Sequence, residues 1–145
     1  MKNFVNDYIG ILIHHTDLAL TSYVKAKLEP LNIAPEQNLI MLLLLEKNGL
    51  TQNEIAQKLN KDKTNIARMI SNLEKKGFIR RHVNEVDRRS LNVYLTDCGE
   101  KLGEKLYPIA REHNQVVCSG ISEEELLIVQ KVLMKMRRNV ENNAK

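Results

Sequence analysis

The sequence predicts a mainly α-helical fold that contains one small β-hairpin. Residues 51–76 have the pattern of two short helices, and residues 78–96 have the pattern of two alternating strands joined by a polar, doubly basic turn. Apolar stripes at helical spacing come before and after this region. The order of helix, turn, helix and hairpin is typical of a winged helix-turn-helix, so we expect such a lobe over residues 50–96, flanked by helices on both sides.

The length and composition are those of a single globular domain over residues 1–145, with 43% apolar and 28% charged residues. The longest apolar run, Leu39 to Leu45, has seven residues, whereas a membrane-spanning helix needs about 20. No export signal is recognised near the amino terminus, and Cys98 and Cys118 lack the spacing of a metal site or a disulfide framework. We therefore expect a cytoplasmic protein with no membrane partner.

The amino-terminal third predicts two helices. Apolar residues from Phe4 onward recur at near-helical spacing, which indicates a first helix over about residues 4–28, and Pro30 ends the pattern. Pro35 suits the first turn of a second helix, because its missing N–H would be unpaired there anyway. Asn48 and Gly49 predict where this helix stops.

The central region predicts the two helices of the helix-turn-helix. Thr51 and Glu54 form a capping box at the start of a third helix over about residues 51–59, and Asp62 is placed to cap a fourth. In the fourth helix the apolar residues Ile66, Ile70 and Leu73 share one narrow face, and Gly77 ends the helix. The other side of this helix is polar and carries Lys63, Thr64, Arg68, Ser71 and Lys75.

The remainder predicts a hairpin and two further helices. The runs F-I-R-R-H-V and L-N-V-Y-L alternate, and Asp87, Arg88 and Arg89 lie at the tip between them. A helical pattern resumes at Asp97, and Ser122 with the acids after it predicts a second capping box. We expect the last helix to bury an apolar stripe made of Leu126, Val129, Leu133, Met136 and Val140.

Basic residues are concentrated in the predicted lobe. Residues 61–90 hold nine Lys and Arg against four Asp and Glu, a local net charge of +5, whereas the whole chain has a net charge of +4. Such a cluster neutralises phosphates in nucleic-acid-binding proteins, although charge runs also occur on ordinary solvated surfaces.

The polar side of the fourth helix has the residue types that read base edges. An α-helix fits the major groove, where Arg68 can bond guanine O6 and N7 together and Asn65 can pair with an adenine edge. An arginine on a projecting turn can enter the minor groove, and Asp87 can orient it through a charge-assisted hydrogen bond. The alternatives are an ordinary amphipathic helix and a solvated hairpin with a weak surface ion pair. The residues expected to contact DNA are Thr51, Lys63, Thr64, Asn65, Arg68, Asn72, Arg81, Asp87, Arg88 and Arg89.

Several runs resemble the MarR family of bacterial transcription regulators. They are L-T-Q-N-E-I-A-Q-K-L, N-L-E-K-K-G-F-I-R-R and D-R-R-S, followed by L-T at Leu95 and Thr96. The resemblance extends over essentially the whole chain and implies an obligate, triangular homodimer that binds a pseudo-palindromic operator, usually as a repressor. It also implies release when a small molecule enters a pocket between the dimer region and the DNA-binding lobe. Under this resemblance, residues 63–68 read the major groove, while Arg88 and Arg89 are wing contacts.

The flanking helices independently predict a partner. Residues 1–30 and 97–142 carry apolar faces that a 145-residue monomer with long arms would leave exposed, so a second copy of the chain is expected to cover them. A two-fold dimer would place two recognition helices about one DNA turn apart.

The sequence says least about the effector to which such a regulator responds. A small aromatic or anionic effector is assigned to His14, His15 and Tyr23 on the first helix. A peroxide-sensing branch of the family uses a cysteine that would fall near Gly10, whereas Cys98 is the first cysteine here, so thiol sensing of that kind is not expected. Cys98 begins a helix, which can lower a thiol pKa, but we expect an inert, buried thiol.

No cofactor or metal is predicted. Adjacent histidines on a helix point about 100° apart, so His14 and His15 cannot chelate one ion together. An enzyme is the least favoured class, because no nucleophile-base pair, Gly-rich phosphate loop or paired carboxylates is recognised. The main alternative to a DNA-binding regulator is a winged-helix module that docks a protein and binds DNA weakly.

Overall fold

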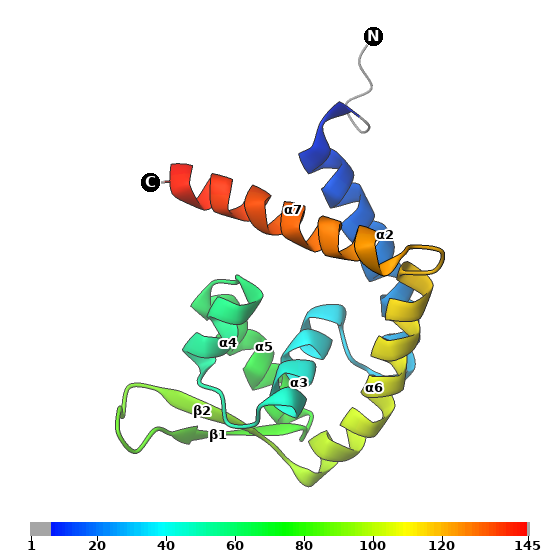
Figure 1. The fold of residues 1–145 in the computed structure, drawn as a ribbon. Helices are drawn as coiled ribbons and strands as arrows, with labels where there is room; N and C mark the ends of the chain where they lie inside the picture. Colours follow the sequence, from blue (N-terminus) through cyan, green and yellow to red (C-terminus); the bar gives the residue numbers. More distant parts are fainter. Residues whose placement is uncertain (1–6, 145) are drawn as a thin grey trace. The chain divides into compact units, whose positions relative to one another are not determined.

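The computed structural model describes residues 7–144, which form the predicted mixture of helices and one antiparallel hairpin (Figure 1). The elements, in chain order, are α2 (Ile9–Leu28), η1 (Glu29–Leu31), α3 (Pro35–Glu46), α4 (Gln52–Leu59), α5 (Lys63–Lys75), β1 (Ile79–Val83), β2 (Leu91–Leu95), α6 (Asp97–Val117) and α7 (Glu123–Asn143). The predicted start of the first helix at Phe4 lies outside the described residues. The chain divides into two compact units, the first ending at His113 and the second starting at Asn114.

The predicted caps set the starts of the two central helices. Thr51 Oγ1 accepts the Glu54 N–H at 3.1 Å, and Glu54 Oε1 accepts the Thr51 N–H at 2.9 Å. At the start of α5, Asp62 Oδ1 accepts the Asn65 N–H at 2.8 Å. Gly77, whose φ is +87°, turns the chain from α5 into β1 in a conformation that favours glycine. The capping residues therefore place the boundaries of the helix-turn-helix where the sequence predicts them.

The hairpin is joined to the start of α4 by a short pairing that sequence reasoning missed. β1 and β2 pair with Ile79 opposite Leu95 and Val83 opposite Leu91. Outside this pair, the Val93 N–H donates to the Leu50 carbonyl at 2.8 Å, and the Gly49 N–H donates to the Val93 carbonyl at 3.0 Å. Residues 49–51 thus pair with the middle of β2 as a short third strand would.

The core of the first unit is formed by residues of α2, α3, α4, α5, the hairpin and the first half of α6. The three residues predicted for the buried face of the recognition helix, Ile66, Ile70 and Leu73, are each fully buried. Eighteen apolar side chains form this core: Val24, Leu28, Ile33, Ile40, Met41, Leu44, Leu50, Ile55, Ala56, Ile66, Met69, Ile70, Leu73, Ile79, Val93, Leu95, Leu102 and Leu106. Burial of one side of α5 leaves its polar side facing solvent.

The second unit corrects the expectation that the last helix buries its apolar stripe. Ser122 and Glu125 form the predicted capping box of α7. However, none of the residues of α7, all of which the structure describes, is buried. Val129 is 49% exposed and Val140 is 68% exposed. No helix within residues 7–144 is long and apolar enough to cross a membrane.

Candidate nucleic-acid interface

The exposed side of α5 brings the predicted base-reading residues together. Lys63, Thr64 and Arg68 are exposed, and Asn65 is half-buried. The Arg68 guanidinium donates a hydrogen bond to the Asn65 side-chain oxygen, so these two predicted readers lie next to each other on adjacent turns. Asn72 is exposed and lies one turn further along the same helix. This arrangement offers donors and acceptors of the kind that recognise base edges.

The amino-terminal end of α5 borders a hollow at the turn between α4 and α5. Lys61 lies at this turn and forms an ion pair with Glu36 at 2.8 Å, which links the turn to α3. Asn53 and Gln57 also face this hollow, although sequence reasoning did not single them out. The hollow is lined by Asn53, Ala56, Gln57, Asn60, Lys61, Asp62 and Lys63.

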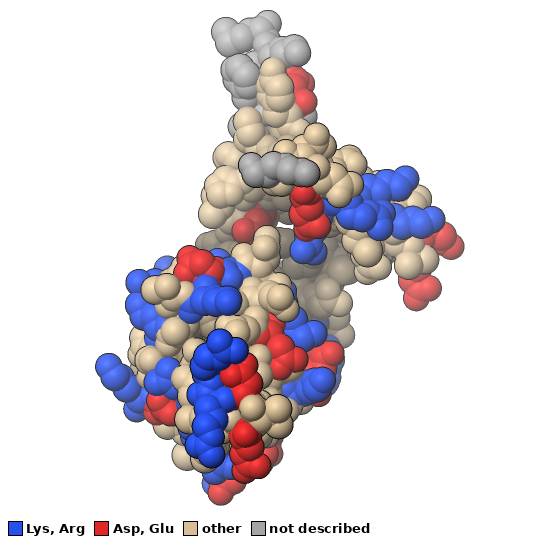
Figure 2. All heavy atoms as spheres, turned by 90° about the vertical axis from the view of Figure 1, so that its left-hand side faces the viewer, with Lys and Arg blue, Asp and Glu red and all other residues tan. Residues whose placement is uncertain are grey.

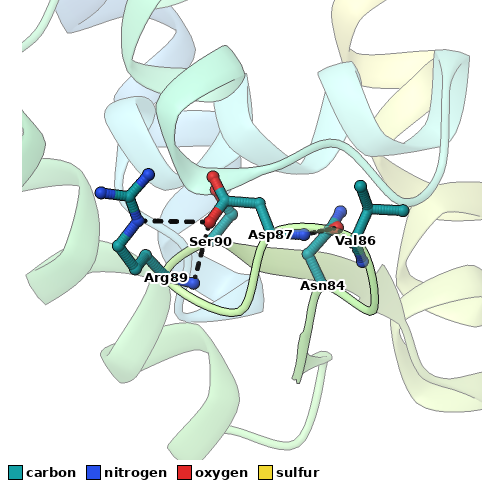
Figure 3. Close-up of polar contacts among 5 residues, drawn as sticks. All are labelled: Asn84, Val86, Asp87, Arg89 and Ser90. Carbon is teal, nitrogen blue, oxygen red and sulfur yellow. Dashed lines mark hydrogen bonds and ion pairs between the residues drawn. The ribbon is translucent and has the colours of Figure 1, made fainter.

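Side-chain hydrogen bonds hold the turn of the wing in one conformation (Figure 3). Asn84 Oδ1 accepts the N–H groups of Val86 and Asp87, both at 2.9 Å. Asp87 Oδ1 accepts the backbone N–H of Arg89 at 3.1 Å and its guanidinium Nε–H at 3.4 Å. Ser90 Oγ donates to the other oxygen of the same carboxylate at 3.3 Å. The turn is therefore built largely from its own polar side chains.

Asp87 orients Arg89, the second of the two tip arginines. The Arg89 side chain is 94% exposed, so this ion pair adds little to stability and acts mainly on direction. Asn84, whose side chain accepts two backbone hydrogen bonds at the start of the turn, was not among the functional residues predicted from the sequence. An asparagine at the start of a polar turn is the signal that could have identified it.

The end of the hairpin points to the left in Figure 1 and therefore toward the viewer in Figure 2. Figure 2 shows Lys and Arg side chains at this end, with Asp and Glu side chains beside them. The projecting tip is thus basic but not uniformly so. Asp87, an acidic residue of the hairpin turn, accepts a hydrogen bond from the backbone N–H of Arg89.

Arg81 occupies a different environment from the tip arginines. Its guanidinium donates to Glu74 Oε1 from Nη2 at 2.9 Å and from Nε at 3.3 Å, and its Nη1 donates to Gln52 Oε1 at 3.3 Å. Every guanidinium nitrogen therefore has a partner inside the lobe. The hydrogen bond from Arg81 holds the pKa of the Glu74 carboxyl below its ordinary value. Thr51, another predicted contact, is half-buried and uses its hydroxyl as the cap of α4.

The residues assigned to an effector are separated along α2. The exposed rings of His14 and His15 lie 6.4 Å apart at 85°. Tyr23 lies eight residues beyond His15, about 12 Å further along the helix axis. Its hydroxyl donates to Glu112 at 2.9 Å, a bond that raises the pKa of Tyr23 and lowers that of Glu112. The structure therefore groups Tyr23 with α6 rather than with the two histidines.

Tyr23 also stacks on His113, with ring centroids 5.7 Å apart. His113 Nε2 lies 3.1 Å from the Leu20 carbonyl oxygen, which adds a second link between α2 and α6. Within residues 7–144 no cluster of three potential metal ligands is found.

The environment of the cysteines differs in part from the sequence expectation. Cys98 was expected to be buried, but it lies in the exposed part of the first turn of α6. The buried residues of α6 are Gly99, Leu102, Gly103 and Leu106, and Cys98 lies about 100° from Gly99 around the helix. Cys118 is half-buried, and its thiol lies 3.6 Å from the Asn114 side-chain oxygen.

Proteins that are similar to this chain in sequence or in structure include transcriptional regulators. The model of the MarR family matches residues 33–91. An HTH-type transcriptional regulator of Bacillus subtilis, YybA, is 30% identical over 129 residues, which are 86% of this chain and 83% of that protein.

Two similar solved structures contain DNA. The S. aureus MepR–DNA complex has a TM-score of 0.85 and 30% identity, with 96% of this chain and 99% of that chain covered. A putative MarR family regulator from Listeria monocytogenes, in complex with a 26mer DNA, has a TM-score of 0.80 and 26% identity over 99% of this chain and 92% of that chain. The fold of this chain is therefore similar to that of two proteins whose structures were solved with DNA.

Proposed function

The chain belongs to the MarR family of DNA-binding transcriptional regulators, and we propose that it represses transcription as a homodimer bound to a pseudo-palindromic operator. The observation that carries this proposal is the presence, in one lobe, of a polar recognition helix and a projecting basic wing. Lys63, Thr64 and Arg68 are exposed on α5, and Arg89 is directed by Asp87 at the end of the hairpin.

Each part of the lobe has a separate task in this proposal. Arg68 and Asn65 read base edges in the major groove, where an arginine bonds guanine and an asparagine bonds adenine. Arg88 and Arg89 enter the neighbouring minor groove, whose negative potential attracts arginine. Lys63 neutralises a phosphate near the start of α5, and that contact carries affinity rather than sequence preference.

The homodimer is supported by apolar surface that the single chain leaves uncovered. On α2, Ile9 and Leu18 are each 53% exposed, and on α7, Leu127 and Ile128 are 62% and 60% exposed. Large apolar side chains that are exposed on a helix support an interaction site there. A second copy related by two-fold symmetry buries the same patches on both chains.

We further propose that a small aromatic or anionic molecule releases the operator. His14, His15 and Tyr23 are the candidate ligands of this effector. Tyr23 supports the proposal because it contacts Glu112 and His113 on α6, so an effector beside it would act on the link between two flanking helices. Binding must differ between the DNA-bound and free conformations for the effector to act.

Selection of bound duplexes from a random pool tests the proposed function. We expect a two-fold symmetric consensus with half-sites about 10 base pairs apart, and an affinity that falls steeply with salt. Weak binding with no sequence preference and little salt dependence would instead favour a protein-docking module. A light-scattering mass equal to the monomer mass of 16.7 kDa at micromolar concentration would contradict the dimer.

A further inference from the structure

Arg81 links three elements of the DNA-binding lobe. It lies on β1, and it contacts Glu74 in the last turn of α5 and Gln52 in the first turn of α4. In addition to the guanidinium bonds, the backbone N–H of Arg81 donates to Glu74 Oε2 at 3.1 Å. One carboxylate therefore receives both the main chain and the side chain of the same strand residue.

The Glu74–Arg81 contact is more enclosed than the other ion pair of the wing. The Arg81 and Glu74 side chains are 25% and 36% exposed, whereas the Arg89 side chain is 94% exposed. Partial burial strengthens an ion pair relative to one in bulk water. Arg80, the adjacent residue on β1, is exposed and lies over the Tyr94 ring at 5.9 Å. The two neighbouring arginines thus face different surroundings on one strand.

The contact lies where it can set the angle of the wing. Residues 49 and 50 hold β2 at Val93, and Glu74 holds β1 at Arg81, the residue opposite Val93 in the hairpin. Strands rise about 3.3 Å per residue, so the tip lies on the order of 15 Å beyond Arg81. A tilt of about 10° at the base would then move the tip by about 2.5 Å, close to the length of a hydrogen bond.

We propose that Arg81 is a positioning residue rather than a DNA contact, and that the Glu74–Arg81 contact holds the wing at a fixed angle to the recognition helix. The inference rests on the proposed function and deepens it, because α5 and the tip arginines must reach neighbouring grooves of one duplex at the same time. It also changes the role expected for Arg81 from the sequence. Three of the five guanidinium N–H groups of Arg81 are engaged by protein, and the Glu74 carboxylate already pairs with its charge, so Arg81 is less available to a phosphate than the tip arginines are.

Substitution of Glu74 separates positioning from charge. Removing an acid from a DNA-binding surface should strengthen binding if charge alone matters. Glu74→Ala and Glu74→Gln remove the same charge, but only glutamine keeps a hydrogen-bond acceptor for Arg81. We expect Glu74→Ala to weaken operator binding about tenfold, which is within the range for coupled neighbours, and Glu74→Gln to weaken it less.

The matched control is Glu85→Ala, which removes an exposed acid from the wing. The Glu85 side chain makes no hydrogen bond or ion pair with any residue from 7 to 144. Its removal should leave binding unchanged or slightly tighter. If Glu74→Ala, Glu74→Gln and Glu85→Ala all bound the operator more tightly than the parent, and to the same extent, the proposal would be overturned.

The salt dependence of binding distinguishes the roles of the arginines. Arg88→Ala should lower the slope of log affinity against log salt by about 1, because it loses a phosphate contact. Arg81→Ala should weaken binding with the slope nearly unchanged. In a protein that already carries Glu74→Ala, Arg88→Ala should lower operator affinity less than it does in the parent. The reason is that a wing without a fixed angle contributes less to binding. Two results would contradict a positioning role for Arg81. One is a decrease of about 1 in the salt slope for Arg81→Ala, and the other is a loss of affinity in the Glu74→Ala, Arg88→Ala double variant that equals the sum of the two single losses.

A measurement without DNA keeps this inference separate from the proposed function. In native-state hydrogen exchange, the hairpin amides should exchange faster in Glu74→Ala than in Glu74→Gln and the parent. Urea unfolding of each variant shows whether it is folded. If the parent binds no duplex, the proposed function fails, while the exchange result still tests the hold on the wing. Equal exchange in all three proteins would refute the hold itself.

Discussion

We expect substitution of Gly99 by alanine to destabilise the protein at the base of the wing, because the added Cβ would meet backbone. This residue is buried in the first turn of α6, and its N–H donates to Thr96 Oγ1 at 3.1 Å. A Cβ at this position would lie 2.1 Å from the Phe78 carbonyl oxygen and 3.1 Å from its carbon. That carbonyl already accepts the Thr96 N–H at 3.0 Å, so it cannot move away without loss of a hydrogen bond.

The expected change in the free energy of unfolding for Gly99→Ala is the difference between a gain in helix propensity and a cost of overpacking. Alanine is favoured over glycine in a helix by about 1 kcal/mol, whereas overpacking costs about 1–3 kcal/mol. Because the clash is with backbone, the upper end applies to Gly99→Ala, and we expect a net loss of about 2 kcal/mol in the free energy of unfolding. Gly103→Ala is the matched control. Its Cβ would meet Leu45 Cδ2 at 2.4 Å, but that atom is the end of a side chain that can rotate. We expect this variant to stay within about 1 kcal/mol of the parent.

The assay is urea unfolding followed by circular dichroism at one fixed protein concentration, since oligomer stability depends on concentration. Operator affinity measured on the same samples should fall for Gly99→Ala, because Phe78 precedes β1. Gly99→Ala with parental stability, or equal losses at the two glycines, would refute the reasoning about the fixed carbonyl.

Further predictions concern the Asp62 helix cap, the arginines proposed to contact DNA and the Glu74 carboxylate. Asp62→Ala should cost about 1 kcal/mol in urea unfolding because the Asn65 N–H loses its acceptor, whereas Asp62→Asn should retain most of that stability. Arg68→Ala should relax base preference at one position by about 1–3 kcal/mol, measured by competition between duplexes. Arg88→Ala should weaken all duplexes alike and lower the salt slope by about 1. Since the pKa of Glu74 is lowered in the folded protein, its contribution to stability is present above the ordinary value of about 4.3 and is lost as pH falls through the folded value. Glu74→Gln should lack this part of the acid dependence in urea titrations.

Each of these outcomes can fail on its own. Parental stability of Asp62→Ala would mean that another group caps α5. Unchanged operator affinity in both Arg68→Ala and Arg88→Ala would count against the DNA interface as a whole. An acid dependence of Glu74→Gln equal to that of the parent would contradict the hydrogen-bonded state assigned to the carboxylate.

Local signals account for the parts of the fold that could be predicted. The Thr51–Glu54 capping box and the Asp62 cap each act within three residues, so the sequence alone indicates where α4 and α5 begin. Helical periodicity likewise identified the buried face of α5. The Asp87 turn was predictable for the same reason, because its partner Arg89 is two residues away.

Contacts between distant segments were not predictable in this way. The pairing of Leu50 with Val93 and the contact of Arg81 with Gln52 join residues 43 and 29 positions apart. Strand alternation places Arg80 and Arg81 on opposite faces of β1, but no local pattern indicates that Glu74 and Gln52 are the partners of Arg81.

The sequence by itself determined the order of the elements, their caps, the basic lobe and the family resemblance, because these depend on side chains that are close together along the chain. Only the tertiary structure decided which polar residues are available to DNA. Availability depends on whether a side chain has already found a partner elsewhere in the fold, as Arg81 has and Arg89 largely has not. In α7 the apolar stripe likewise has a predictable pattern, but none of the residues of this helix is buried.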